Sequence, residues 1–383
     1  MASYKSFFQL PEKLHYLNCA YMSPMLREVE EAGIAGIRMK RDPSSLAPAD
    51  FFTLAAELKA KFGSLINCPA DHVAIIPSAS YGLAAAVQNL PIDQGNRVIV
   101  VGEEFPSAYY AAERWCRTHG KQLKTVTAPE YAKGRGLHWN QKLIASITAD
   151  TVAVIMSSIH WGDGTLFDLV EIGQVCRANG AMLIIDGTQS IGALPFDVQA
   201  VQPDALICAA YKWLMGPYSI GLAYYGPAFQ QGKPLEESWM TRSNATVFSE
   251  LTSYVDDYVS GAGRFDMGEF SNFILLPMLD HALAQLLEWN VQTIQDHCST
   301  LSRPLVRYLQ NRGWWVEEEG YRAAHLFGFA LPAHVDPQHL IALLKAAHVH
   351  VSLRGKAIRV SFHLYNDAAD VEALTKVLDQ VQP

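Results

Sequence analysis

From about residue 50, short and wholly apolar runs alternate with segments whose apolar residues recur at helical spacing. The apolar runs predict buried strands at residues 72–77, 97–102, 151–157, 181–186, 205–209 and 220–225. Helical spacing predicts helices at residues 80–89, 107–119 and 169–179, with Gly120 and Gly180 as C-terminal stops. Apolar strands joined by helices are typical of parallel sheets, so the pattern predicts a doubly wound α/β sheet.

The pattern changes after about residue 270. A long helical stretch at 275–311 is followed by strand candidates at 314–318 and 325–331, a helix at 337–347, two short strands within 349–362 and a helix at 369–381. No internal repeat or long Gly/Ser/Pro linker separates the two regions. We therefore expect a large domain over residues 21–265 and a smaller α+β domain over residues 266–383.

The composition narrows the range of partners. Of the 383 residues, 50% are hydrophobic and 18% are charged, which suits a large buried core. The formal net charge is −8, and no long run of Lys or Arg occurs. We therefore expect no nucleic acid and no membrane surface as a partner, and a small-molecule substrate instead.

The cysteines and the N-terminus bear on the compartment. Six cysteines are scattered without C-x-x-C spacing, which fits free thiols in a reducing cytoplasm, and we expect no metal site. The first residues lack a basic region followed by a long apolar stretch, and no apolar segment reaches the ~18 residues of a membrane span. The sequence therefore predicts a cytoplasmic protein without a signal peptide.

Polar and aromatic side chains follow the apolar runs, at the sheet edge where open α/β sheets bind ligands. Ser78 and Ser80 open a helix and could hold a phosphate, although a plain serine N-cap is the simpler alternative. Phe105 could cover a planar ring or belong to the ordinary core. His160 could hydrogen-bond a ring hydroxyl or a substrate, or have structural partners only.

Asp186 and Lys212 are the most informative of these residues. Asp186 ends an apolar run, where a carboxylate is costly unless it meets a cation, although it could also cap a helix. Lys212 lies between Ala-Ala-Tyr and Trp-Leu-Met, which favours imine formation, although a lysine snorkelling from a core strand would look similar. Gln189 could donate to a ring oxygen. A Schiff-base lysine and a carboxylate for a pyridinium nitrogen are a protein's two handles on pyridoxal phosphate.

Segments along nearly the whole chain resemble one family. They are Tyr16-Leu-Asn-Cys-Ala-Tyr-Met-Ser-Pro, Ser78-Ala-Ser, Asp186-Gly-Thr-Gln-Ser, Tyr211-Lys212, Gly263-Arg-Phe-Asp-Met-Gly-Glu and Val351-Ser-Leu-Arg-Gly-Lys-Ala-Ile-Arg-Val-Ser-Phe-His-Leu-Tyr-Asn. The sequence resembles the class V aminotransferase group of fold-type-I pyridoxal phosphate enzymes. That group includes cysteine desulfurases, kynureninases and isopenicillin-epimerase-like proteins.

The resemblance implies a fold and a set of cofactor contacts. The large domain should contain a mostly parallel seven-stranded sheet, and residues 1–20 should pack near the active site. Lys212 would be the Schiff-base lysine, Asp186 would hold the pyridine nitrogen and Gln189 would contact the ring oxygen. Ser78, Ala79 and Tyr211 would contact the phosphate. Together with the residues considered above, the expected cofactor contacts also include Ser80, Phe105 and His160.

The resemblance also implies substrate contacts and a second subunit. Arg359 would anchor the α-carboxylate of an amino acid through its planar guanidinium, with Arg354 and Asn18 as further substrate-binding candidates. Family members build each site from two subunits. We therefore expect a homodimer with shared active sites, in which Arg264 or nearby residues reach the neighbouring cofactor.

The sequence departs from particular branches of the family. No cysteine follows Cys298, whereas desulfurases carry a nucleophilic cysteine in the small domain, so desulfurase activity is not expected. Phe105-Pro106-Ser107 and Tyr211-Lys212-Trp213 look like kynureninase, but His160 stands where an Asn is expected, which argues against kynurenine specificity.

We expect a pyridoxal phosphate enzyme acting on an amino acid, with an aminotransferase as the first hypothesis. A lyase or an epimerase is the alternative, because transamination, elimination and epimerisation share one carbanion. A non-catalytic ligand sensor with the same fold is a second alternative. A nucleotide-dependent enzyme is disfavoured, because no G-x-G-x-x-G or G-x-x-x-x-G-K-[ST] motif follows a strand.

Overall fold

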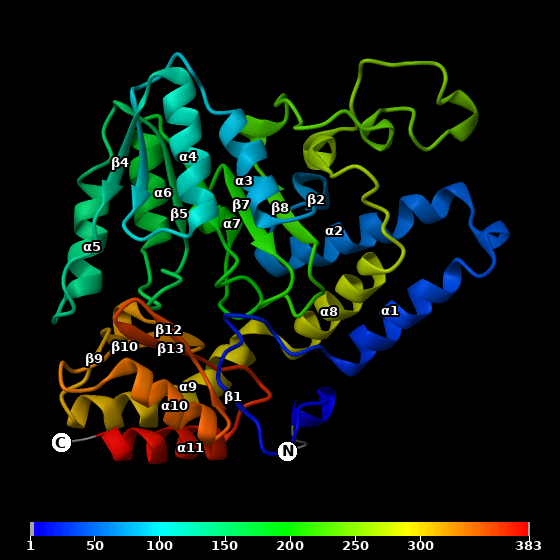
Figure 1. Ribbon diagram of the computed structural model, residues 1–383. Coiled ribbons are helices and arrows are strands. Elements are labelled where there is room, and N and C mark those ends of the chain that lie inside the picture. The colour runs from blue at the N-terminus through cyan, green and yellow to red at the C-terminus, as the bar shows by residue number, and fades with distance from the viewer. Residues whose placement is uncertain (1–3, 382–383) are drawn as a thin grey trace.

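A seven-stranded sheet dominates the computed structural model, which describes residues 4–381 (Figure 1). The strand order is β2-β8-β7-β6-β5-β3-β4. The bounds are β2 Val73–Ile76, β3 Arg97–Val101, β4 Gln122–Val126, β5 Thr151–Ser157, β6 Met182–Asp186, β7 Ala205–Ala209 and β8 Gly221–Tyr225. Only β8 runs against its neighbours; it pairs antiparallel with both β2 and β7. The expected α/β fold with a mostly parallel seven-stranded sheet is confirmed.

Alternate residues of each strand point to opposite faces, and both faces are covered by helices. On one face the strands pack with α3 (Ala79–Gln88) and α4 (Pro106–His119). On the other face they pack with α2 (Thr53–Ile66), α5 (Arg135–Ile144), α6 (Leu169–Ala178) and α8 (Leu275–Trp289). Short helix α7 (Val198–Val201) precedes β7, and α1 (Arg27–Met39) packs on α8. Burial on two sides explains why these strands are apolar throughout.

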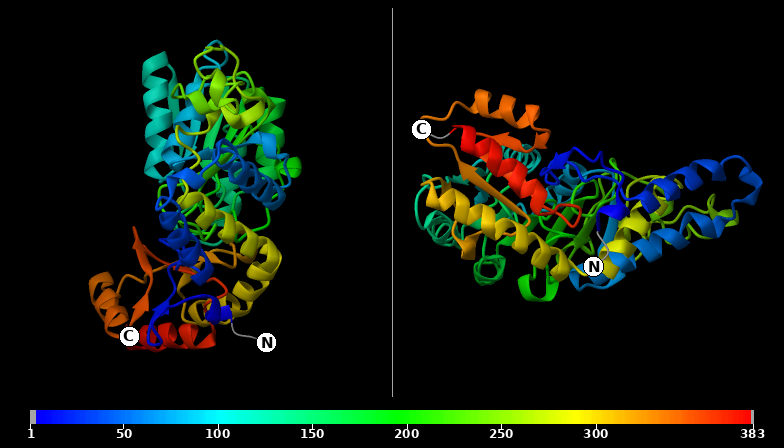
Figure 2. Two further views of the ribbon diagram at one scale, coloured as in Figure 1. Left: turned by 90° about the vertical axis from the view of Figure 1, so that its right-hand side faces the viewer. Right: turned by 90° about the horizontal axis from the view of Figure 1, so that it is seen from below.

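A smaller, four-stranded antiparallel sheet lies beside the large one (Figures 1 and 2). Its order is β12-β13-β10-β9, with β9 Trp315–Val316, β10 Leu326–Ala330, β12 Ser352–Arg354 and β13 Ala357–Ser361. Helices α9 (Val291–Asn311), α10 (Pro337–Ala346) and α11 (Ala368–Leu378) accompany it. The single helical stretch expected at 275–311 is wrong: Asn290, at φ 65°, separates α8 from α9. The domain boundaries at 20 and 265 stay a prediction.

The N-terminal segment pairs with two strands from the C-terminal part of the chain. Strand β1 (His15–Tyr16) pairs in parallel with β11 (Val349–His350), and Asn18 forms a bridge with Ser361. Two residues on, the backbone N–H of Ala20 donates to Ser361 Oγ at 2.9 Å. Residues 1–3 of the predicted N-terminal segment lie outside the described residues.

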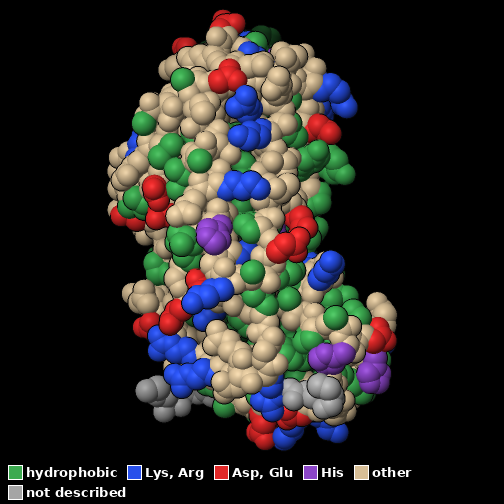
Figure 3. All heavy atoms as spheres, turned by 90° about the vertical axis from the view of Figure 1, so that its left-hand side faces the viewer, with side chains coloured by type: hydrophobic (Ala, Val, Ile, Leu, Met, Phe, Trp, Pro, Cys, Tyr) green, Lys and Arg blue, Asp and Glu red, His purple; other side chains and the backbone are tan. Residues whose placement is uncertain are grey.

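One face of the described chain carries charges of both signs. On the face drawn in Figure 3, basic side chains are interspersed with acidic ones and do not gather into one broad patch. None of the helices between residues 4 and 381 is both long and apolar enough to cross a membrane.

Candidate active site

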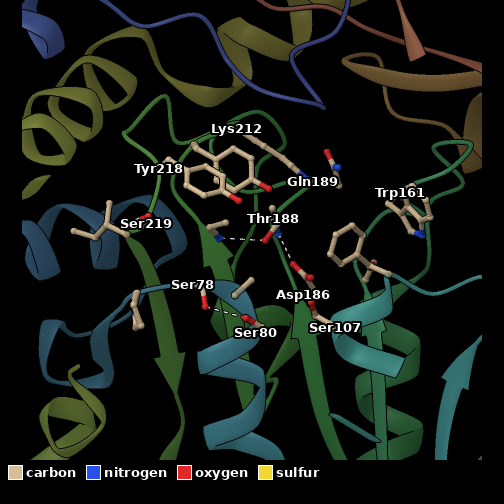
Figure 4. A pocket seen from close by; sticks show the side chains of 17 residues that line it. Ser78, Ser80, Ser107, Trp161, Asp186, Thr188, Gln189, Lys212, Tyr218 and Ser219 are labelled. Atoms are coloured by element: carbon tan, nitrogen blue, oxygen red, sulfur yellow. Dashed lines mark hydrogen bonds between the residues drawn. The ribbon is translucent and has the colours of Figure 1, made fainter. Parts of the chain in front are cut away.

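A cavity of about 330 Å³ lies where the carboxyl ends of β2, β3, β5, β6 and β7 meet the amino end of β8 (Figure 4). Ligands of open α/β sheets bind at this edge. Its wall is formed by Pro77, Ser78, Ala79, Ser80, Phe105, Ser107, Ser157, Trp161, Asp186, Thr188, Gln189, Ala209, Tyr211, Lys212, Tyr218, Ser219 and Ile220. The sheet thus brings together residues that are far apart in the sequence.

The N-terminus of α3 forms one end of this cavity. Ser78 caps the helix, since its Oγ accepts from the backbone N–H of Tyr81 at 3.2 Å and lies 2.9 Å from Ser80 Oγ. Ser78, Ala79 and Ser80 all line the cavity. The first N–H groups of a helix favour an anion. The N-cap alternative and the anion-site hypothesis are therefore compatible at this position.

Asp186 is a buried carboxylate, 6% exposed, in the wall of the cavity. Its Oδ1 accepts from the backbone N–H of Thr188 at 2.9 Å. Burial raises the pKa of Asp186, while the hydrogen bonds from Thr188 and the charge of Lys212 partly oppose that shift. In the described part of the chain no basic side chain forms an ion pair with Asp186. A cationic N–H in the cavity would therefore stabilise this carboxylate.

Lys212 follows β7 and is 7% exposed. Its Nζ lies 5.6 Å from the centre of the Phe105 ring and 5.5 Å from that of Tyr211. Its pKa is lowered from 10.5 to about 8; burial is the main cause, Asp186 opposes the shift, and Arg359 and Arg354 add to it. An appreciable share of this amine is neutral near physiological pH, as a nucleophilic lysine requires.

The loop that carries Phe105 is held by hydrogen bonds from Glu104 and Trp161. Glu104 Oε1 accepts from the backbone N–H of Phe105 at 2.7 Å, and Oε2 accepts from that of Ser157 at 2.8 Å. Trp161 Nε1 donates to the Glu103 carbonyl at 2.7 Å, and the Phe105 and Trp161 rings meet edge to face. Phe105 is therefore fixed beside Lys212 by groups at the end of β5 and in the loops that follow β3 and β5.

His160 lies behind this loop and does not line the cavity. Its Nδ1 is 3.0 Å from Asp163 Oδ1, and its Nε2 is 3.3 Å from the Glu103 carbonyl. Asp163 also pairs with Arg135 at 2.8 Å, and both side chains are 2% exposed. Burial lowers the pKa of His160, but Asp163 and Glu104 together raise it and the net shift is upward. This arrangement agrees with the alternative interpretation of His160, in which the side chain has structural partners only.

The two predicted amide groups also bind protein atoms. Gln189 lines the cavity, but its Nε2 donates to the Ala20 carbonyl at 3.1 Å and its Oε1 accepts from Trp213 Nε1 at 2.9 Å. Asn18 Oδ1 accepts from Ser352 Oγ at 2.8 Å, and Asn18 lines neither this cavity nor the adjoining one. The Asn18 side chain therefore bonds to β12 of the small sheet and not to a ligand in either cavity.

A second cavity of about 320 Å³ adjoins the first and shares Phe105, Trp161, Gln189, Tyr211, Lys212 and Tyr218 with it. The rest of its wall is formed by Ala20, Tyr21, Met22, Arg354 and Arg359. Arg359, 2% exposed, donates through Nη1 to the Trp161 carbonyl at 2.7 Å. Burial and then Arg354 lower the pKa of Arg359 to about 9. Both predicted arginines thus reach the Lys212 site from the small sheet.

Several residues that line the two cavities were not predicted from the sequence. Tyr218, Ser219 and Ile220 enter because antiparallel β8 begins at the edge where the other strands end. Tyr21 and Met22 enter through the N-terminal segment, and only the family's opening motif pointed to them. Arg264 lines neither cavity and donates through Nη1 to the Gly232 carbonyl at 3.2 Å.

The described walls of the two cavities contain neither a cysteine nor a cluster of metal-binding side chains. No cysteine lines either cavity. All six cysteines are free, and only Cys68 is not buried. Within residues 4–381, no three His, Cys, Asp or Glu side chains gather in a way that could hold a metal ion.

Comparisons with known proteins agree with this geometry. The model of the aminotransferase class-V family matches residues 44–374. The uncharacterized aminotransferase YcbU of Bacillus subtilis is 24% identical over 84% of this chain and 81% of its own length. A probable cysteine desulfurase of Methanothermobacter thermautotrophicus is 21% identical over 85% and 83%, respectively. The solved structure of the cystine C-S lyase C-DES with cysteine persulfide has a TM-score of 0.82 at 18% identity and covers 96% of this chain and 98% of its own. The chain belongs to the class V aminotransferase family of pyridoxal phosphate-dependent enzymes.

Proposed function

We propose that the protein is a pyridoxal phosphate-dependent aminotransferase that acts on an amino acid. One observation carries the proposal: a buried lysine with a lowered pKa shares a cavity with a buried carboxylate that has no ion-pair partner among the described residues. The family and the Bacillus subtilis relative support transamination as the reaction.

The residues of the cavity fit pyridoxal phosphate. Its volume of about 330 Å³ falls within the usual range of small-molecule pockets, about 300–1,000 Å³. The N-terminus of α3 offers N–H groups for the phosphate, next to Ser78 and Ser80. Asp186 offers an anion to the ring nitrogen, and Phe105 offers an aromatic face beside Lys212.

Asp186 and Lys212 would have different tasks. When bound, pyridoxal phosphate supplies an electron-withdrawing ring that stabilises negative charge at the substrate Cα. Asp186 would hold a proton on the ring nitrogen, which removes the cost of its own burial. Lys212 Nζ would bind the cofactor covalently and later move a proton to and from the substrate Cα.

The remaining wall residues would bind the substrate and exclude water. Arg359 would hold the α-carboxylate, because its guanidinium can donate two parallel N–H bonds. Phe105, Trp161 and Tyr218 would keep solvent from the reacting carbon. Gln189 would act mainly by fixing Ala20, since its side chain already bonds the N-terminal segment.

A lyase or epimerase reaction would begin with the same loss of a proton, and the C-S lyase among the structural relatives keeps that alternative in view. A desulfurase that loads sulfur onto its own thiol is disfavoured, because no cysteine lines either cavity. The epimerase and ligand-sensor hypotheses are separated from transamination by product analysis.

We also propose a homodimer in a cytoplasmic location. Exposed apolar side chains on α1, namely Ile34, Ile37 and Met39, support a contact between subunits, and the six free cysteines suit a reducing compartment. Mixing Arg264→Gln with Lys212→Arg tests shared sites. Recovery of activity in the mixture would support a residue that acts across the interface, and no recovery would count against Arg264 in that role.

The test of the proposed function has two stages. Purified protein should show a visible absorbance band that borohydride removes, with the reduced label on Lys212. Lys212→Arg should lose the band, whereas Lys356→Arg, at an exposed site, should keep it. Amino acids are then incubated with 2-oxo acids: an aminated acceptor supports the proposal. Ammonia release, a D-amino acid or no turnover would support the lyase, epimerase or sensor alternative, respectively.

A further inference from the structure

The cavity that adjoins Lys212 gathers positive charge without an acid. Its wall contains Lys212, Arg354 and Arg359, and no Asp or Glu is among its lining residues. The arginine ion pairs of the described chain involve other arginines. An uncompensated group of cations inside a cavity is costly, and an anionic ligand offsets that cost.

The two arginines project from the same face of the small sheet. On β12 and β13, Ser352 lies opposite Arg359, and Arg354 lies opposite Ala357. Side chains two positions apart on a strand share a face, so Arg354 lies on the face of Ser352 and of Arg359. They are diagonal neighbours, a spacing that long side chains bridge.

Each guanidinium still has unused donors. Arg359 donates to the Trp161 carbonyl, while its buried Nε has no hydrogen-bond partner. Arg354 is half-buried, lies 5.7 Å from the Trp161 ring and donates to the Leu353 carbonyl at 3.1 Å. Its buried Nε also has no partner. Both side chains can therefore donate to an anion without losing a hydrogen bond to the protein.

The cofactor does not account for this charge. Ser78, Ala79 and Ser80, the residues suited to the phosphate, line the first cavity and not the second. Asp186, the acid that faces Lys212, also lines only the first cavity. The α-carboxylate of an amino acid would neutralise Arg359 and leave Arg354 uncompensated.

We propose that the substrate is an amino acid with a second carboxylate, which Arg354 binds while Arg359 binds the α-carboxylate. This inference rests on the proposed function, which supplies the amino acid and its orientation toward Lys212. Tyr21 and Tyr218 also line this cavity, and both are exposed. A ligand that closes off solvent there strengthens both charge-assisted pairs.

The experiment compares acids with their neutral isosteres on the holoenzyme. Dissociation constants for aspartate against asparagine, and glutamate against glutamine, are measured from the change in cofactor absorbance. Calorimetry with glutarate against valerate needs no turnover. We expect the acid of the preferred length to bind roughly 10-fold to 100-fold more tightly than its isostere. Arg354→Gln should remove the preference, and Lys356→Gln, which deletes an exposed charge in the same turn, should keep it.

Two results would overturn the inference while the proposed function stands. One is a cofactor spectrum that responds equally to acid and amide in the wild-type protein. The other is a preference for the acid that survives Arg354→Gln, which would leave packing on Trp161 as the role of that arginine. A protein whose spectrum responds to no amino acid would instead count against the proposed function, and the glutarate measurement would still report on the arginine pair.

Discussion

The lowered pKa of Lys212 predicts how the cofactor-free protein captures pyridoxal phosphate as pH changes. Burial brings this pKa from 10.5 to about 8. Only the neutral amine attacks an aldehyde. At pH 7.5 about a quarter of such amines are neutral, against about one in a thousand for an ordinary lysine. Lys212 should therefore react roughly 200-fold faster than surface lysines of equal access.

The direction of the pH dependence follows from the same shift. Capture should speed up as pH rises through about 8, where the amine loses its proton, and should level off above that pH. Arg359→Gln removes a cation that disfavours the protonated amine, so the midpoint should move upward. The move should stay below about one pH unit, because burial, the largest cause, is unchanged. Lys356→Gln should leave the midpoint where it is.

Stopped-flow absorbance after mixing cofactor-free protein with pyridoxal phosphate, from pH 6.5 to 10, measures the capture rate. Borohydride reduction and peptide mapping then identify the labelled lysine. A midpoint near that of an ordinary lysine would refute the burial argument. A downward shift in Arg359→Gln would refute the role given to the charge of Arg359. A label on another lysine would refute the placement of Lys212.

Three substitutions test the support of the site. Phe105→Ala removes a ring 5.6 Å from Lys212 Nζ and should weaken cofactor retention by about 1–2 kcal/mol, measured by equilibrium dialysis. Asp163→Ala leaves buried Arg135 without its closest acid and should cost about 3–5 kcal/mol of unfolding free energy in urea. Gly192→Ala should lower the melting temperature by several degrees, because φ is 98° there and a Cβ would collide with the carbonyl of the residue after Lys212.

A specific result would contradict each of these three predictions. Unchanged cofactor affinity in Phe105→Ala would show that the ring does not contact the cofactor. Glu372→Ala, which breaks an exposed pair, is the control for Asp163→Ala, and equal stability losses in both would contradict the burial argument. Wild-type melting of Gly192→Ala would mean that the loop before β7 can move aside.

The strands were predictable where burial makes every residue apolar. β5 and β7 have the predicted bounds, since both faces of each are covered. β4 (Gln122–Val126) was missed because it lies at the sheet edge and only Val126 is buried. α5 was missed because it buries Arg135 and Asn140 together with Trp139 and Leu143, so its inward face mixes polar and apolar residues. Local patterns thus report burial well, but not polar contacts between distant elements.

The candidate site shows the same division. Ser78, Phe105, Asp186 and Lys212 could be placed together because parallel strands end at one edge, a rule that needs no coordinates. His160 also follows the end of a strand, yet its ring contacts Asp163 and the Glu103 carbonyl and does not line the cavity. Which of two neighbouring side chains turns inward depends on contacts that sequence spacing does not encode.

The hydrogen bond between Ala20 and Ser361 joins residues 341 positions apart. At a synthesis rate of about 5–20 residues per second, the acceptor emerges from the ribosome roughly 17–70 s after the donor. All strands of the large sheet precede residue 226, so that sheet can assemble while the first residues still lack their partner. The wall formed by Ala20, Tyr21 and Met22 is then among the last parts to be completed. A nascent chain released before β13 would lose Arg359 and this wall together, and so would lack a substrate cavity even with its large sheet formed.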